Sequence, residues 1–256
     1  MHITHVIWLK LVPGIVGLLL VQAAVAGVDS SVGATYRSYP LSGGLEPTIG
    51  YGWVAYGTEG SPFSGYLRAA LDGFTAGSYN SGVAKLEVFP LAFIGARAGG
   101  ESIQNDKDYR SYQCTSVGCK GRYYRTFVES ELSLGYGGAF AQGTWRRERW
   151  TQAKGQTSDY IDPTSGLVMS ATGESQTVYS AVVGYKFNPS WALLGGVRYA
   201  EDDDGMAQMP FGMIRWISGK LTLGVGGGSF KSELKKREAT ALAYFTWNIW
   251  PSVAIK

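Results

Sequence analysis

The fold is decided by the stretch QTVYSAVVGYKFNPSWALLGGVRY, which spans residues 176–199. On both sides of the tripeptide at 188–190, apolar residues alternate with smaller or polar residues. A period of two is typical of β-strands, whose successive side chains point to opposite faces. Asn, Pro and Ser favour a tight turn. The stretch therefore predicts an antiparallel β-hairpin with one apolar face.

The same alternation recurs along most of the chain, in segments separated by Gly, Pro, Asn and Ser. The predicted strands are 31–39, 48–57, 64–75, 82–89, 91–102, 122–135, 138–150, 176–188, 191–200, 208–217, 220–231 and 238–249. The pattern also allows ten or fourteen strands, because Leu167 to Ser170 can add to a hairpin and Val253 to Ile255 resembles a strand stub. We expect about twelve antiparallel strands in an all-β domain.

The composition agrees with this class of protein. Gly accounts for 36 of 256 residues, about twice the usual ~7%. Aromatic residues make up 13% and charged residues 17% of the chain, and the mixture lacks both the high charge of disordered proteins and the period of collagen. Aromatic side chains suit sheet surfaces and membrane interfaces. A packed or membrane-embedded β domain remains.

The first 26 residues predict a signal peptide. An apolar run from Leu11 to Val25 follows Lys10 and ends at the small-residue sequence Ala24-Val25-Ala26. A retained anchor helix is the alternative, which Pro13 and Gly14 disfavour by interrupting the run. We therefore expect export, followed by a single barrel domain at residues 27–256.

The exported part of the chain excludes several functions. Both histidines lie in the first 26 residues, which excludes His-dependent catalysis and His-ligated metals. Once Lys10 is removed with the signal segment, the chain has 22 Lys and Arg residues and 20 Asp and Glu residues. Such a balance of charge does not indicate nucleic-acid binding. Glu129 and Glu131 share a strand face, but neighbouring arginines disfavour the protonated state that a general acid needs. We expect no cofactor, no metal and no enzymatic activity; a lipid-active enzyme using these two carboxylates is the weakest hypothesis.

Connections between the predicted strands alternate in length. The shorter set is 58–63, 90, 137, 189–190 and 218–219, and the longer set is 40–47, 76–81, 103–121, 151–175, 201–207 and 232–237. Outer-membrane barrels have short turns at one end and long loops at the other. An even number of strands then places both chain ends at the short-turn end.

Aromatic residues indicate which face of the strands is outside. The predicted aromatic belts comprise Trp53, Trp191, Trp216 and Trp247 near the short-turn end, and Tyr124, Trp145 and Tyr199 near the long-loop end. Lipid headgroups select such belts, whereas the core of a secreted β-sandwich, the alternative, has no reason to sort aromatics by depth. We predict an antiparallel transmembrane β-barrel with an apolar exterior and a charged lumen.

These features together resemble the outer-membrane β-barrel proteins of Gram-negative bacteria. The resemblance rests on the signal segment, the alternating strands, the turn FNPSW (187–191) and the final stretch TALAYFTWNIW (240–250). It is architectural, and no motif singles out one family. It implies an outer-membrane location and contact with membrane lipid and lipopolysaccharide. The chain departs from the pattern in one respect, since residues 251–256 follow the last aromatic residue, Trp250.

The charged face of the strands predicts the lining of the lumen. The predicted pore-lining residues are Arg37, Arg68, Asp72, Lys85, Glu87, Arg97, Arg125, Glu129, Glu131, Lys186, Arg198 and Arg215. Eight are basic and four acidic, so a passive diffusion channel with a modest preference for small anionic solutes is one hypothesis. The other is a salt-bridged, plugged lumen in a structural barrel whose external loops bind a protein partner or lipopolysaccharide. Three inward glycines, Gly224, Gly226 and Gly228, either open space or let their strand bend.

Three loop features carry further expectations. Cys114 and Cys119 close a six-residue loop, and in an exported chain a disulfide is preferred over two free thiols. Arg146, Arg147 and Arg149, with Trp145 and Trp150, are predicted at the long-loop rim, where they hold lipopolysaccharide phosphates or are simply solvated. The acidic run Glu201-Asp202-Asp203-Asp204-Gly205 is either a hydrated turn or a ligand set for a divalent cation.

Overall fold

The computed structural model describes residues 26–58, 61–77, 79–109, 111–112, 114, 117–153 and 158–250. The predicted signal segment, except for Ala26, and the predicted stub at 253–255 lie outside these residues. None of the described residues belongs to a helix long and apolar enough to cross a membrane.

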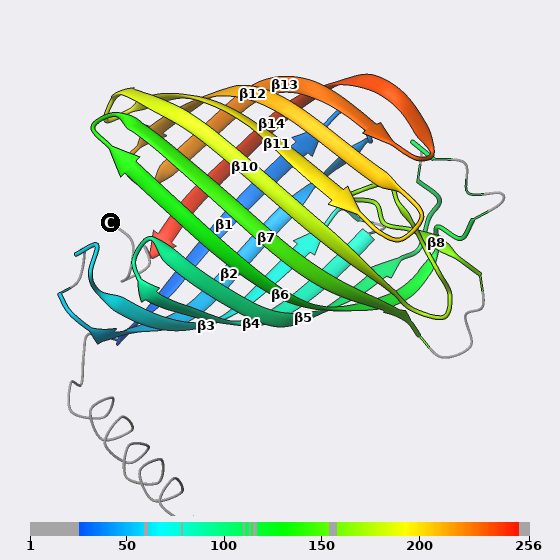
Figure 1. The fold of residues 1–256 in the computed structure, drawn as a ribbon, viewed down its shortest axis with the longest axis horizontal. Helices are drawn as coiled ribbons and strands as arrows, with labels where there is room; N and C mark the ends of the chain where they lie inside the picture. The colour runs from blue at the N-terminus through cyan, green and yellow to red at the C-terminus, as the bar shows by residue number, and fades with distance from the viewer. Residues whose placement is uncertain are drawn as a thin grey trace, which may run out of the picture.

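Twelve antiparallel strands close into a tilted barrel, as Figure 1 shows. They are β1 (Ala26–Arg37), β2 (Ser42–Tyr56), β3 (Gly65–Thr75), β4 (Tyr79–Leu91), β5 (Ile94–Asn105), β6 (Gly121–Tyr136), β7 (Ala139–Gln152), β10 (Glu174–Asn188), β11 (Trp191–Glu201), β12 (Met206–Ser218), β13 (Leu221–Ser232) and β14 (Lys235–Trp250). Each predicted strand overlaps one of them, so the all-β fold and the strand number of twelve are confirmed.

The barrel closes where β1 pairs with β14. Val32 lies opposite Trp247 and Arg37 opposite Leu242, in an antiparallel ladder that contains one irregularity, between Ser30 and Ser31. Closure gives the backbone groups of the first and last strands partners within the sheet. A chain that crosses hydrocarbon needs this condition, because lipid offers no hydrogen bonds.

Two extra strands belong to a loop and not to the barrel. β8 (Tyr160–Ile161) and β9 (Val168–Met169) pair only with each other in a small separate sheet. The segment Leu167 to Ser170, which allowed a count of fourteen, therefore adds no barrel strand.

The lengths of the connections differ from the expectation. At the end where β1 begins, the strands are joined by residues 57–64, 92–93, 137–138, 189–190 and 219–220; at the other end the joining residues are 38–41, 76–78, 106–120, 153–173, 202–205 and 233–234. Only 106–120 and 153–173 are long. The predicted link at 40–47 was wrong because Gly43, Gly44 and Pro47 continue β2, opposite β1, and strand pairing overrides their preference for turns.

The strands turn their apolar face outward. Leu71, Leu86 and Val128 are 59%, 63% and 50% exposed, whereas the inward-facing Glu87 and Glu101 are 5% and 8% exposed. A soluble monomer rarely exposes a continuous apolar surface of this kind. The orientation is the reverse of a soluble β-sandwich, and it suits a barrel surrounded by acyl chains.

Candidate functional site in the barrel lumen

One wall of the lumen carries a continuous network of ion pairs, which begins on β1 and β3. Arg68 binds Asp29 at 2.6 Å and Glu87 at 3.0 Å. Lys85 binds Asp72 at 2.7 Å and Glu87 at 3.3 Å. Glu87 thus joins two bases on neighbouring strands, an arrangement that compensates each charge in place.

Arg97 extends this network across β5 and β6. Its guanidinium nitrogens lie 2.5 Å from Glu129, 2.6 Å from Glu131 and 3.4 Å from Glu87. The two carboxylates considered as a catalytic pair therefore share one arginine, and Glu129 also lies 3.5 Å from Arg146 of β7.

Arg125 completes the network near the long-loop end. Its side chain binds Glu101, with Nε at 2.8 Å, and Glu148, with Nη1 at 3.0 Å. Arg146 binds Glu148 at 2.5 Å, and the Trp150 indole donates to Glu148 at 3.2 Å. Glu101, Glu148 and Trp150 are buried, whereas the Arg146 side chain is 21% exposed.

Arg146 and Trp150, which were predicted at the long-loop rim, face the interior of the barrel. Arg146 points into the lumen network, and Trp150 is 1% exposed in the interior. The physical reason is strand parity: Trp145 faces outward, so the alternate residues of β7 must face inward. Arg147 and Arg149 do face outward and are exposed.

The predicted surplus of positive charge is smaller than expected. Asp29, Glu46, Glu101 and Glu148 also line the interior, which raises the acidic count from four to eight, while Arg146 raises the basic count from eight to nine. The sequence did hold a signal for Glu101: it lies four residues after Arg97 on β5, and residues an even number apart on a strand share a face. Asp29 was missed because it preceded the first predicted strand.

The opposite wall carries basic residues of another kind. Arg37, Lys186, Arg198 and Arg215 lie on the lumen face of β1, β10, β11 and β12, and none has a carboxylate within ion-pair distance among the described residues. Arg215 lies over the ring of Phe140, 5.4 Å from its centroid. The lumen is therefore asymmetric: the ion-paired wall holds five bases and seven carboxylates, and it faces a wall whose bases have no carboxylate partners among the described residues.

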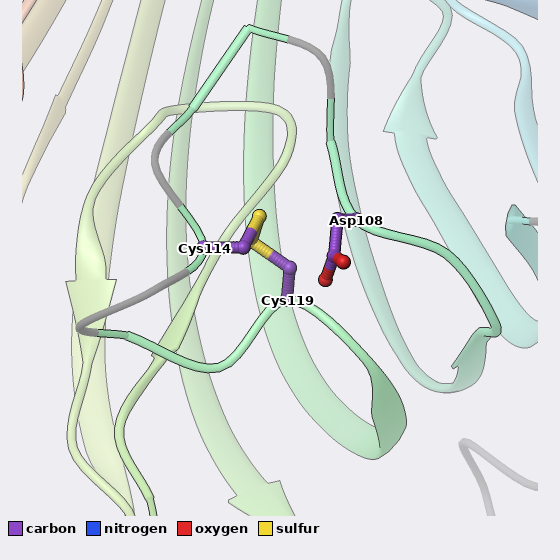
Figure 2. Close-up of side chains that lie close together, drawn as sticks. All are labelled: Asp108, Cys114 and Cys119. Carbon is purple, nitrogen blue, oxygen red and sulfur yellow. A yellow bond between two sulfur atoms is a disulfide. The ribbon is translucent and has the colours of Figure 1, made fainter.

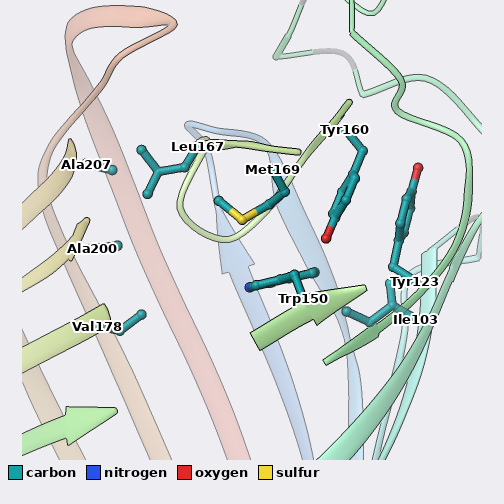
Figure 3. Packing of buried hydrophobic residues seen from close by; sticks show 9 residues of the cluster. All are labelled: Ile103, Tyr123, Trp150, Tyr160, Leu167, Met169, Val178, Ala200 and Ala207. Atoms are coloured by element: carbon teal, nitrogen blue, oxygen red, sulfur yellow. The ribbon is translucent and has the colours of Figure 1, made fainter. Parts of the chain in front are cut away.

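The loop 153–173 folds into the long-loop mouth of the barrel. Its residues Tyr160, Leu167 and Met169 are 1%, 0% and 0% exposed. Figure 3 shows them packed with residues from six barrel strands, namely Ile103, Tyr123, Trp150, Val178, Ala200 and Ala207. This apolar contact holds the loop against strands of both walls at the mouth.

Polar contacts fix the loop to the far side of the barrel. Arg37 of β1 donates to the carbonyls of Pro163 at 3.1 Å and Thr164 at 3.3 Å. The buried Asp162 accepts from the Thr164 and Ser165 hydroxyls at 2.8 and 2.6 Å. Burial alone would raise the pKa of Asp162, but the Arg125 charge and these hydrogen bonds hold it below its ordinary value. The loop thus spans the lumen.

The second long connection, residues 106–120, supports this loop. Cys114 and Cys119 form a disulfide with their Cα atoms 5.5 Å apart. The adjacent Gly118 donates to the Asp159 carbonyl at 2.7 Å and accepts from Ile161 at 3.1 Å. Asp108 lies beside the disulfide (Figure 2). Because both sulfurs are bonded to each other, this trio offers a metal ion a single carboxylate.

Two adjoining cavities occupy the lumen. A cavity of about 560 Å³ lies against the ion-pair network, and one of about 550 Å³ lies beneath Pro163 and Thr164; both are lined by Glu46, Phe74, Ser81, Glu101 and Arg125. Gly224 adds no open space, because a Cβ there would lie 2.1 Å from the Tyr244 ring that occupies the position.

The residues of the predicted aromatic belts all lie on the outer face. Trp53, Trp191, Trp216 and Trp247 lie toward the short-turn end, with the Trp191 and Trp216 rings 6.5 Å apart. Toward the other end, Tyr124 lies near the start of β6, and Trp145, Tyr179 and Tyr199 lie in register on three adjacent strands. Trp145 is near the middle of β7 and not at its end. Sequence reasoning omitted Tyr179 from this row.

The acidic loop at 202–205 forms its own turn. The Asp202 carboxylate accepts from the backbone of Asp204 at 3.1 Å and of Gly205 at 2.6 Å. Burial and the charges of Asp204 and Asp203 raise the pKa of Asp202 above its ordinary value. These contacts favour the interpretation as a turn.

Comparison with known proteins yields likeness of fold alone. No protein-family profile and no curated protein sequence matches the chain. Among solved structures, the chain is similar to the porin NanC, with 9% identity, a TM-score of 0.45 and coverage of 85% of this chain and 98% of that one. A loop-deletion mutant of OmpT, an outer membrane protein of Vibrio cholerae, is similar with 9% identity and a TM-score of 0.45, and the match covers 90% of this chain and 100% of that one. LpxR from Salmonella typhimurium is similar with 8% identity and a TM-score of 0.44, and the match covers 86% of this chain and 99% of that one.

Proposed function

We propose that this protein is an outer-membrane diffusion channel for small polar solutes, with a modest preference for anions. The outward apolar face and the closed sheet support the membrane location. The adjoining polar cavities inside the barrel support a path for solutes.

The unpaired basic wall is the observation that carries the anion preference. Every base of the ion-pair network is held by carboxylates, and the network has seven carboxylates for five bases, so it adds no positive charge to the lumen. Lys186, Arg198 and Arg215 lack such compensation among the described residues. Fixed guanidinium and ammonium groups lower the electrostatic barrier for negative solutes in a narrow lumen.

Recording in planar lipid bilayers under a KCl gradient tests this function. We expect a small conductance and a reversal potential that favours chloride. The double variant Lys186→Glu/Arg198→Glu should shift the reversal potential toward potassium. Arg237→Glu changes the charge of an exposed residue of β14 and should leave the potential unchanged. Absence of conductance, or cation preference of the wild type at moderate salt, would contradict the proposal.

The packed loop favours a second candidate function. With Tyr160, Leu167 and Met169 packed across the mouth, the barrel can instead act as a structural protein whose outer loops bind a partner. Deletion of residues within 106–120 and 153–173 should then abolish partner binding while the barrel retains its heat-modifiable mobility on gels. Retained binding would exclude the loops as the docking surface.

Contact with lipopolysaccharide is proposed for two arginines at the outer surface. Arg147 and Arg149 face outward from β7 and border a surface hollow of about 430 Å³. Exposed guanidinium groups bind phosphates through paired hydrogen bonds. The variant Arg147→Gln/Arg149→Gln should retain less lipopolysaccharide during purification than the control Arg237→Gln, and equal retention would remove this role.

A catalytic role is not part of the proposal. Glu129 and Glu131 both bind Arg97, which supports a structural role for the two carboxylates. Turnover of a lipid substrate that is lost in Glu129→Gln or Glu131→Gln would overturn this view.

A further inference from the structure

Arg198 differs from the other arginines of the lumen in having no partner. Its side chain lines the cavity of about 550 Å³, and among the described residues it makes neither an ion pair nor a hydrogen bond. A guanidinium carries five N–H donors and stays charged at every physiological pH. Arg198 lies close enough to another base, Arg37, for the two charges to interact. Two cations that face one cavity create a place for an anion.

The charge around this cavity remains positive after internal pairing. Arg125 is committed to Glu101, with Nε at 2.8 Å from the carboxylate. Glu46 accepts from the Thr35 hydroxyl at 2.9 Å. The charge of the buried Asp162 acts on Arg37, so Arg198 is the base of this cavity that remains without a carboxylate partner among the described residues.

The remaining walls of the cavity are largely apolar. Met209, Phe211 and Met213 follow one another along the inward face of β12, and Phe74 and Leu242 lie in the same lining. Thioether side chains adapt to ligands of varied shape. Pro163 and Thr164 of the loop form the roof, which Arg37 holds in place. A ligand here meets a cation at one side and an apolar strip at the other.

We propose that this cavity binds small amphipathic carboxylates, with the carboxylate on the Arg198 guanidinium and the apolar part against Met209, Phe211 and Met213. The cavity has the volume of an ordinary small-ligand site. An arginine and a carboxylate form paired, charge-assisted hydrogen bonds. The inference rests on the proposed channel function, for which it names a solute class.

Calorimetric titration of the folded full-length protein in detergent micelles tests the site. The probe is 4-phenylbutyrate, and titration into empty micelles is the blank. We expect saturable binding, and about tenfold or greater weakening for the uncharged 4-phenylbutanamide, because a hydrogen bond to a charged group is lost. Arg198→Met should weaken phenylbutyrate binding by a similar factor. Arg237→Met removes an equal charge outside the cavity and should bind as the wild type does.

Each result decides for or against the inference. Equal binding of the acid and the amide to the wild type would overturn it, and this comparison requires no variant, so a folding defect of Arg198→Met leaves the test intact. Unchanged binding in folded Arg198→Met would also overturn it, as would equal loss in Arg237→Met. A barrel that conducts chloride but binds no phenylbutyrate refutes this site and leaves the channel. Binding without conductance refutes the channel and leaves a closed binding barrel.

Discussion

At the scale of single residues, Arg125 has the least exposed side chain among the bases of the lumen network. It pairs with both Glu101 and Glu148, and it lies over the Trp150 ring at 4.8 Å. We predict that Arg125→Met lowers the free energy of unfolding by roughly 3 kcal/mol, because two buried carboxylates lose their shared counter-charge. Urea unfolding in detergent measures the change. Arg149→Met, on the exposed face of β7, should shift it by less than about 0.5 kcal/mol. Equal shifts would mean that the network contributes little to stability.

Single residues also show what alternation can and cannot predict. The facing of Arg68, Lys85 and Arg97 followed from the sequence because a strand sends alternate side chains to opposite faces. The partners of these residues did not follow, since pairing depends on the register between strands. Glu87 lies opposite Arg68 and Arg97 only because β3, β4 and β5 align in that register. Arg146 was misplaced because it was grouped with the neighbouring Arg147 and Arg149. Alternation along β7 turns Arg146 to the face opposite theirs.

At the scale of elements, the disulfide loop is predicted to hold the inserted loop in place. Cys114–Cys119 restrains Gly118, which exchanges backbone hydrogen bonds with Asp159 and Ile161. Replacing both cysteines with serine removes a constraint worth about 2 kcal/mol for so short a loop. We expect protease to cut within 153–173 faster, while the barrel keeps its heat-modifiable mobility. Unchanged cleavage would show that the apolar packing alone fixes the loop.

The same loop is predicted to respond to acid through Asp162. Because its folded pKa lies below the ordinary value near 4, the ionised carboxylate stabilises the loop above that pH, and this stabilisation is lost as the pH falls through the lowered pKa. Proteolysis of the loop should therefore accelerate only in strong acid. Asp162→Asn should show fast cleavage at neutral pH as well, whereas Asp108→Asn, at an exposed site, should behave as the wild type does. A rate of loop cleavage in the wild type that stays the same from neutral pH to strong acid would contradict this role of Asp162.

The elements also mark the limit of sequence reasoning about the site. The twelve strands were predictable because each carries a periodic signal over about ten residues. The inserted loop was not, since Tyr160, Ile161, Leu167 and Met169 follow no period and their burial depends on the barrel around them. Four apolar residues within a polar connection were the available signal, because a fully solvated loop gains nothing from them.

At the scale of the whole molecule, the barrel combines an apolar exterior with a lumen that a loop spans at one mouth, with an ion-pair network on one wall and unpaired bases on the other. Two adjoining cavities lie beside the ion-paired wall, so we predict that the inserted loop is the stronger barrier to solutes in the proposed channel. Its conductance would then depend on an element that contributes no strand to the barrel.

Replacement of residues 158–170 by a short Gly-Ser linker separates these two barriers. We predict a several-fold rise in single-channel conductance in planar bilayers, because Tyr160, Leu167 and Met169 no longer fill the mouth. The barrel should still fold, since its twelve strands keep all their partners. A Gly-Ser replacement of residues 202–205, a short turn at the same end, is the matched control and should leave conductance unchanged. If both replacements conduct as the intact chain does, the restriction lies deeper, at the ion pairs of Arg97 and Arg125, and charge removal there becomes the variant that opens the lumen.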